Sequence, residues 1–186
     1  GGGTFNSGSV TFNSAGSVTI LEDSAMNLVG INTGGTTLLT STAGISDAGA
    51  TSVNVGALTV NGTSINLGGG IFNASTLNFN SAGAVTISED SNMDLVGANT
   101  AGTATLSSTA ALSDAGAASV AITGLGNFSG TSISLGGGTF NSGLVTFNST
   151  GAVTILEDST MDLVGINTGA TTLLTSTAGI SDAGAA

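Results

Sequence analysis

The stretch VTILEDSAMNLVGINT, residues Val18–Thr33, occurs three times along this chain of 186 residues. It returns as VTISEDSNMDLVGANT at Val85–Thr100 and as VTILEDSTMDLVGINT at Val153–Thr168. The intervals of 67 and 68 residues identify the sequence as a tandem array. We predict a single solenoid array over residues 1–186, with repeats at approximately 4–70, 71–138 and an incomplete third repeat at 139–186.

Short runs of β-branched and apolar residues fill each repeat. We count nine such runs in the first repeat, separated by Gly, Asn, Asp and Ser, which favour turns. Apolar and polar residues alternate within the runs, as in Val18-Thr19-Ile20, so one face of each run is expected to be buried. Runs this short bury too little surface to fold alone, whereas stacked coils cover one another.

These observations predict an all-β fold without helices, a right-handed parallel β-helix (β-solenoid) with about three coils per 67–68-residue repeat. Each coil would be triangular and contain about 22 residues. The alternative is a string of β-sandwich modules, one per repeat. Sandwich domains have longer strands and commonly a buried Trp, Tyr or Cys, none of which occurs here.

Composition excludes several classes of function. Lys, Arg, His, Cys, Pro, Gln, Trp and Tyr are absent, and the net charge is −11. Without cations, the chain is not expected to bind nucleic acid or an anionic membrane. Without His or Cys, it lacks the ligands of ordinary zinc, haem and iron–sulfur sites and a histidine-assisted nucleophile. We therefore expect no enzyme activity and no cofactor.

The acidic pairs Glu22-Asp23, Glu89-Asp90 and Glu157-Asp158 are the first candidate site. Two nearby carboxylates can act as the acid and base of a glycosidase, but neighbouring residues on a strand point to opposite faces. Their triplication favours a structural role. With three coils per repeat, the three glutamates would line up on one edge as a solvated ridge, about 14 Å apart.

Calcium binding is the second candidate function. Asp90-Ser91-Asn92-Met93-Asp94 has oxygen ligands at alternate positions, as at the start of a calcium loop. The glycine and the bidentate glutamate of such a loop are missing. We assign no catalytic, cofactor-binding or metal-binding residue, and leave open weak calcium binding near Asp90 and Asp94.

Glycine triplets and phenylalanines complete the pattern. Gly1–Gly3, Gly68–Gly70 and Gly136–Gly138 are interpreted as tight corners with positive φ rather than as phosphate-binding loops. Six of the seven phenylalanines occupy two equivalent positions of the repeat and are expected to stack in the core: Phe5, Phe12, Phe72, Phe79, Phe140 and Phe147. Two series of asparagines are expected to form ladders: Asn13, Asn80 and Asn148, and Asn32, Asn99 and Asn167.

The phrases FNSAGSVTI (Phe12–Ile20), LTSTAGISDAGA (Leu39–Ala50) and VNGTSINLG (Val60–Gly68) resemble the tandem repeats of filamentous-haemagglutinin-like giant bacterial surface proteins. The resemblance covers the whole chain and rests on the composition and rhythm of the repeat. It implies a long, secreted, right-handed β-helical shaft of the kind found in adhesins and fibres.

The expected function is a structural shaft of an extracellular or cell-surface filament, stiff and resistant to proteases. The alternative is an adhesin-type binding module that recognises a surface glycan or identical neighbouring shafts. An exposed apolar stripe would favour lateral packing; its candidate members are Leu21, Leu156, Val29, Val96 and Val164. The expected partner is the chain itself, through lateral packing or end-to-end continuation, because strand edges at an uncapped end recruit further strands.

Overall fold

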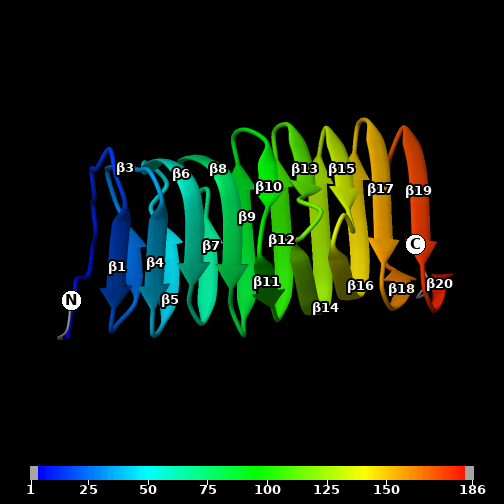
Figure 1. The fold of residues 1–186 in the computed structure, drawn as a ribbon, viewed down its shortest axis with the longest axis horizontal. Helices are drawn as coiled ribbons and strands as arrows, with labels where there is room; N and C mark the ends of the chain where they lie inside the picture. The colour runs from blue at the N-terminus through cyan, green and yellow to red at the C-terminus, as the bar shows by residue number, and fades with distance from the viewer. Residues whose placement is uncertain (1–3, 183–186) are drawn as a thin grey trace.

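Parallel strands wind around one axis in the computed structural model, which describes residues 4–182. Figure 1 shows an elongated stack with the two ends of the chain at opposite ends of the axis. The described residues contain no helix, and so no helix that could cross a membrane.

The strands are short, and most contain three to six residues. In chain order they are β1 (Val18–Glu22), β2 (Met26–Leu28), β3 (Ile31–Gly34), β4 (Thr37–Ser41), β5 (Gly44–Asp47), β6 (Ser52–Asn61), β7 (Ser64–Leu67), β8 (Ile71–Asn80), β9 (Ala84–Glu89), β10 (Met93–Leu95), β11 (Ala98–Ala101), β12 (Thr103–Ser108), β13 (Ala111–Asp114), β14 (Ser119–Gly130), β15 (Ser132–Leu135), β16 (Thr139–Ser149), β17 (Ala152–Glu157), β18 (Thr160–Leu163), β19 (Thr171–Ser176) and β20 (Gly179–Asp182).

Parallel pairing places these strands in three columns, which are the three sides of the coil. Side A contains β1, β4, β6, β8, β11, β14 and β16. Side B contains β2, β5, β7, β9, β12, β14 and β16. Side C contains β3, β6 and β8, followed by β10, β13, β15, β17 and β19.

The longest strands belong to two sides because each of them turns a corner. Residues 52–55 of β6 lie on side C, for example, and residues 58–61 lie on side A. The paired strands β18 and β20 follow β17 and β19 along the chain and complete side A at the C-terminal end.

Alternate side chains point inward and form one apolar core. On side B, the paired residues Ile45, Ile65 and Val85 lie directly above one another and are buried. Adjacent strands of a sheet lie about 4.8 Å apart, so such columns stay in continuous contact. The predicted all-β parallel solenoid is confirmed, with about nine turns.

The coil is shorter than the predicted 22 residues. Paired residues of successive coils are between 18 and 22 positions apart, as Leu77 with Leu95 and Ala104 with Gly126 illustrate. Each coil therefore averages about 20 residues. A repeat of 67 residues is consequently longer than three coils.

A strand that the apolar pattern did not reveal accounts for the difference. β3 has a buried inward residue, but that residue is Asn32, so the strand lacks an apolar signal. Its equivalent in the second repeat, β11, buries Asn99 in the same way. With this strand, each repeat supplies ten coil sides, which is three complete coils and one further side.

Equivalent residues therefore move to the next side of the coil with each repeat. Glu22 ends β1 on side A, Glu89 ends β9 on side B, and Glu157 ends β17 on side C. The register of strand pairing agrees. Leu21 lies in a column with Thr40, Asn61, Asn80 and Thr100. Ser88, the equivalent of Leu21 in the second repeat, lies in a different column, where it pairs with Ser107. The prediction that the glutamates line up on one edge is wrong.

Candidate functional site

Each repeat buries one glutamate at a corner of the coil. Glu22, Glu89 and Glu157 are only 2%, 1% and 2% exposed, so they do not form the predicted solvated ridge. Their Oε1 atoms accept hydrogen bonds of 2.9 Å from backbone N–H groups of the preceding coil, which belong to Ser7, Ala74 and Ser142 respectively. The hydroxyl of the serine two residues further on donates to the same Oε1, at 2.8–3.0 Å.

The second carboxylate oxygen of each glutamate is buried without a hydrogen-bond partner. This holds for Oε2 of Glu22, Glu89 and Glu157, within the part of the chain that the structure describes. Buried polar atoms almost always have a partner, so three orphaned oxygens at equivalent positions are unusual.

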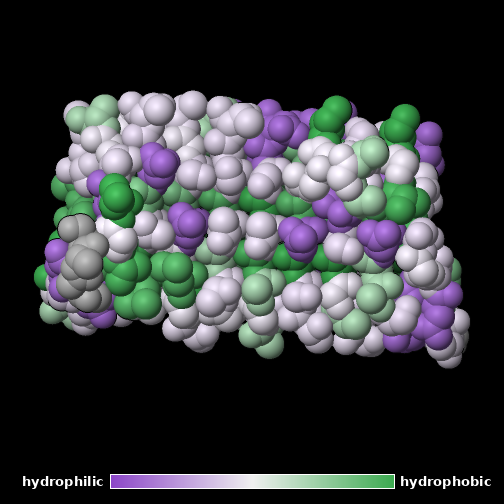
Figure 2. Space-filling view, turned by 180° about the vertical axis from the view of Figure 1, so that it is seen from behind, coloured by the Kyte–Doolittle hydropathy of each residue, from purple (hydrophilic) through white to green (hydrophobic). Residues whose placement is uncertain are grey.

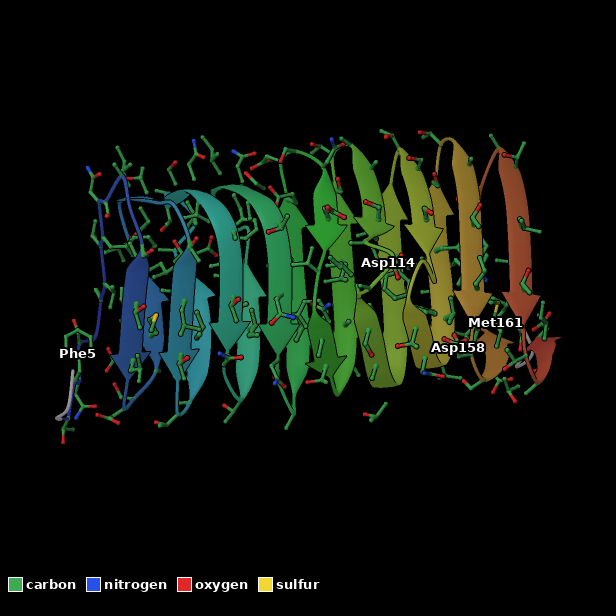
Figure 3. All side chains as sticks on the ribbon, in the orientation of Figure 1. Phe5, Asp114, Asp158 and Met161 are labelled. Atoms are coloured by element: carbon green, nitrogen blue, oxygen red, sulfur yellow. The ribbon has the colours of Figure 1, made fainter. Side chains whose placement is uncertain are left out.

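The aspartate after each glutamate points outward and binds the same segment of the preceding coil as the glutamate does. Oδ2 of Asp90 accepts a 2.9 Å hydrogen bond from the Phe72 N–H, and the Asp90 N–H donates to the Phe72 carbonyl at 2.9 Å. The same bonds join Asp23 to Phe5 and Asp158 to Phe140. Figure 3 places Asp158 and Phe5 near opposite ends of the stack. At each of these corners, N–H groups of the preceding coil therefore find their hydrogen-bond acceptors in the side chains of a Glu-Asp pair.

Burial controls the acidity of these glutamates. It raises the pKa of Glu89 from an ordinary 4.5 to about 7, against the opposing effect of the hydrogen bonds from Ala74 and Ser91. The charge of Asp90 raises it further. Burial also raises the pKa of Glu157. The chain contains no Lys, Arg or His side chain that could offset a buried negative charge.

The inward-pointing asparagines bind backbone groups at a second corner, where the hydrogen bonds between paired strands are interrupted. Oδ1 of Asn32 accepts from the Phe12 N–H at 3.0 Å, and its Nδ2 donates to the Val29 carbonyl at 3.1 Å. Gly30, with a φ of +67°, makes the turn between them. Asn99 and Asn167 make the equivalent bonds on other sides of the coil, so the predicted asparagine ladders between repeats do not form.

Backbone N–H groups of the glycine triplets bind aspartate side chains of the preceding coil. Oδ2 and Oδ1 of Asp47 accept from the Gly68 and Gly69 N–H groups at 3.0 Å, and Asp114 binds Gly136 and Gly137 at 2.9 Å (Figure 3). Gly68 and Gly136 have φ values of +102° and +100°, which confirms the predicted positive φ at these corners. Gly1–Gly3 lie outside the described residues. The roles of Asp47 and Asp114 were not predicted, although each precedes its triplet by little more than one coil.

The calcium candidates bind separate partners. Asp90 accepts from Phe72, Oδ1 of Asn92 accepts from the Ala111 N–H at 3.1 Å, and Oδ1 of Asp94 accepts from the Ser113 hydroxyl at 3.2 Å. No group of three or more His, Cys, Asp or Glu side chains suited to a metal occurs among the described residues.

Chelation of calcium is therefore expected to leave the fold intact. The carboxylates that stabilise the corners already accept N–H groups, so removing divalent cations breaks no bond seen in the structure. Circular dichroism and a thermal melt with and without a chelator, at physiological ionic strength, should superimpose. A lower melting temperature on chelation, restored by added calcium, would instead support a calcium site near Asp90 and Asp94.

The predicted burial of the phenylalanines is mostly confirmed, but those at equivalent positions do not stack on one another, because Phe72 lies above Val53 on side C and Phe140 above Val120 on side A. Phe72, Phe79, Phe140 and Phe147 are buried, whereas Phe5 lies at the N-terminal end and is 45% exposed. Phe128, which was not placed in the core series, is also buried and meets Phe140 edge to face, with ring centroids 5.6 Å apart.

The five residues suggested for an exposed apolar stripe do not form one. Leu21 and Leu156 are exposed, but they lie on sides A and C. Val29, Val96 and Val164 are partly buried and occupy three different corners. Figure 2 shows apolar residues beside the C-terminal end, where the exposed Ile166, Leu173 and Ile180 belong to the last coil.

Two shallow hollows of about 420 and 430 Å³ adjoin one another at Thr123, beside side A. Hydroxyl, amide and small side chains line most of both hollows, the second also contains Asp162 and Ile122, and no lining residue is aromatic. The hollows therefore lack the aromatic rings on which a sugar ring could stack.

Comparison of the chain with protein-family models, with curated proteins and with solved structures gives no match. The arrangement itself consists of carboxylates and carboxamides that bind backbone groups of neighbouring coils. Its direct chemical consequence is to hold the corners of the solenoid together.

Proposed function

We propose that this chain is part of a structural shaft, a stiff and protease-resistant β-solenoid of an extracellular or cell-surface filament. The observation that carries the proposal is the continuity of the ladder. Strands pair in three columns along about nine coils, and side-chain carboxylates or amides supply acceptors at corners where backbone pairing is interrupted. The absence of Lys and Arg also removes every cleavage site for trypsin-like proteases.

The last described coil exposes side chains whose equivalents are buried in the inner coils. Ile180 is 50% exposed, whereas its equivalent in the first repeat, Ile45, is 1% exposed beneath the next coil. Leu174 is likewise partly exposed, whereas its equivalent Leu39 is fully buried. The same positions are thus ready to be covered by another coil, either from the same chain or from a second copy.

End-to-end association of the 186-residue chain is expected to depend on Ile180 and not on Leu21. Burying an isoleucine contributes about 1.5–3 kcal/mol, so Ile180→Asp should weaken association at least about tenfold. Leu21→Asp, at an exposed position on the side of the shaft, is the matched control. Sedimentation and electron microscopy of both variants measure the effect.

Filaments that survive Ile180→Asp but are lost with Leu21→Asp would indicate lateral packing, the alternative mode of assembly. A wild-type chain that stays monomeric at every concentration would contradict association through the ends.

A further inference from the structure

We propose that Glu89 and Glu157 are proton-dependent locks of the solenoid. Each holds its corner closed as a neutral carboxylic acid and loosens that corner when it releases its proton. The proposal concerns the stability of the coil and does not depend on assembly into a shaft.

The geometry of the carboxyl groups is the first argument. Oε1 of each glutamate accepts two hydrogen bonds, one from a backbone N–H and one from a serine hydroxyl. Oε2 accepts none and is buried. Ionisation would place half of the negative charge on an atom that neither water nor a donor reaches, which is costly in an apolar core.

The surroundings of each glutamate are the second argument, because every charged group near it is negative. Glu89 ends β9, which pairs with β7 and β12, and its side chain also accepts from Ala74 on β8. None of these three strands contains a charged residue, and Glu89 is followed by Asp90 and then by Asp94 on β10. Glu157 lies between β16 and β19, which are also uncharged, and is followed by Asp158 and by Asp162 on β18.

No described strand packed against Glu89 or Glu157 carries a cation, so a proton is the remaining means of neutralising either carboxyl group.

The two glutamates lie at different corners of the coil. Because the repeat advances by one side, Glu89 occupies the B–C corner and Glu157 the C–A corner. Deprotonation would consequently loosen two corners of the stack rather than one face.

The direction of the pH effect follows from burial. The folded chain holds the Glu89 proton up to a pKa of about 7, whereas the unfolded chain releases it near 4.5. The stabilisation is complete below 4.5 and is lost as the pH rises through 7. From Glu89 alone, the equilibrium constant for unfolding should rise about 300-fold between a pH well below 4.5 and a pH well above 7.

The test measures protonation and stability separately on the 186-residue chain, at concentrations where it is monomeric. Carbon-13 NMR of side-chain-labelled glutamate follows the carboxyl groups from pH 4 to pH 9, in steps of about one pH unit. Denaturant unfolding over the same range gives the stability. We expect the Glu89 carboxyl to titrate near 7 and stability to fall as it does so.

Glu89→Gln is the informative variant, because its amide oxygen can still accept from Ala74 and Ser91 while the group no longer titrates. It should lose the Glu89 share of the pH dependence. Asp162→Asn, on the remote strand β18, also replaces one carboxyl group by an amide and should keep the Glu89 share of the dependence.

Titration of the Glu89 carboxyl near its ordinary 4.5, or an unchanged pH dependence in Glu89→Gln, would overturn the proposal. If Glu89→Gln does not fold, the NMR titration of the wild-type chain decides alone. Failure to form filaments has no bearing on either readout.

Discussion

Replacing Phe140 with alanine is expected to lower the free energy of unfolding by about 3–5 kcal/mol, the usual cost of removing a buried phenylalanine. Phe140 is fully buried, pairs in register with Val120, and contacts the ring of Phe128. A smaller side chain would leave a cavity between coils that the rigid ladder cannot close. Denaturant unfolding of the monomeric chain measures the loss.

Phe5→Ala is the matched control, since Phe5 occupies the equivalent position of the first repeat but is 45% exposed. Its expected cost is below about 1 kcal/mol. Equal effects of the two substitutions would show that Phe140 is not a core residue. A large effect of Phe5→Ala that appears only at high protein concentration would indicate that another coil covers Phe5 on association.

Gly138→Ala is expected to destabilise the chain by about 3 kcal/mol or more, although it adds a single methyl group. A Cβ atom at this position would collide with the carbonyl oxygen of Ala118 in the preceding coil. That oxygen accepts a 3.0 Å hydrogen bond from the Thr139 N–H, so it cannot move without breaking the ladder.

Gly116→Ala provides the control, because its Cβ atom would meet its nearest neighbour, the Gly137 carbonyl oxygen, at an ordinary 3.6 Å. Thermal melts of the two variants should differ clearly. Similar melting temperatures would mean that the coils can separate at this corner without cost.

The pattern of apolar residues was sufficient to predict the solenoid. Alternation in runs such as Val18-Thr19-Ile20 and Ile65-Asn66-Leu67 requires one buried face, and runs of this length require neighbours to cover it. The tandem repeat supplies those neighbours. Gly68 and Gly136 could be recognised as corners because only glycine adopts positive φ without strain.

The pattern of apolar residues did not predict that each repeat advances by one side of the coil. β3 and β11 point an asparagine into the core, and a polar residue in a strand is normally a sign of the solvated face. Without this strand, a repeat has nine sides in place of ten, which is three complete coils. Glu22, Glu89 and Glu157 would then lie on one edge.

What the sequence determined by itself is therefore the architecture, a stack of short parallel strands around an apolar core, because alternation and turn residues are local properties. Only the tertiary structure decided which polar side chains lie inside. Burying Asn32 or Glu89 is favourable only where a neighbouring coil presents an unpaired N–H group, such as those of Phe12 and Ala74. Those partners are 15–20 residues away in sequence, and their position depends on the length of each coil.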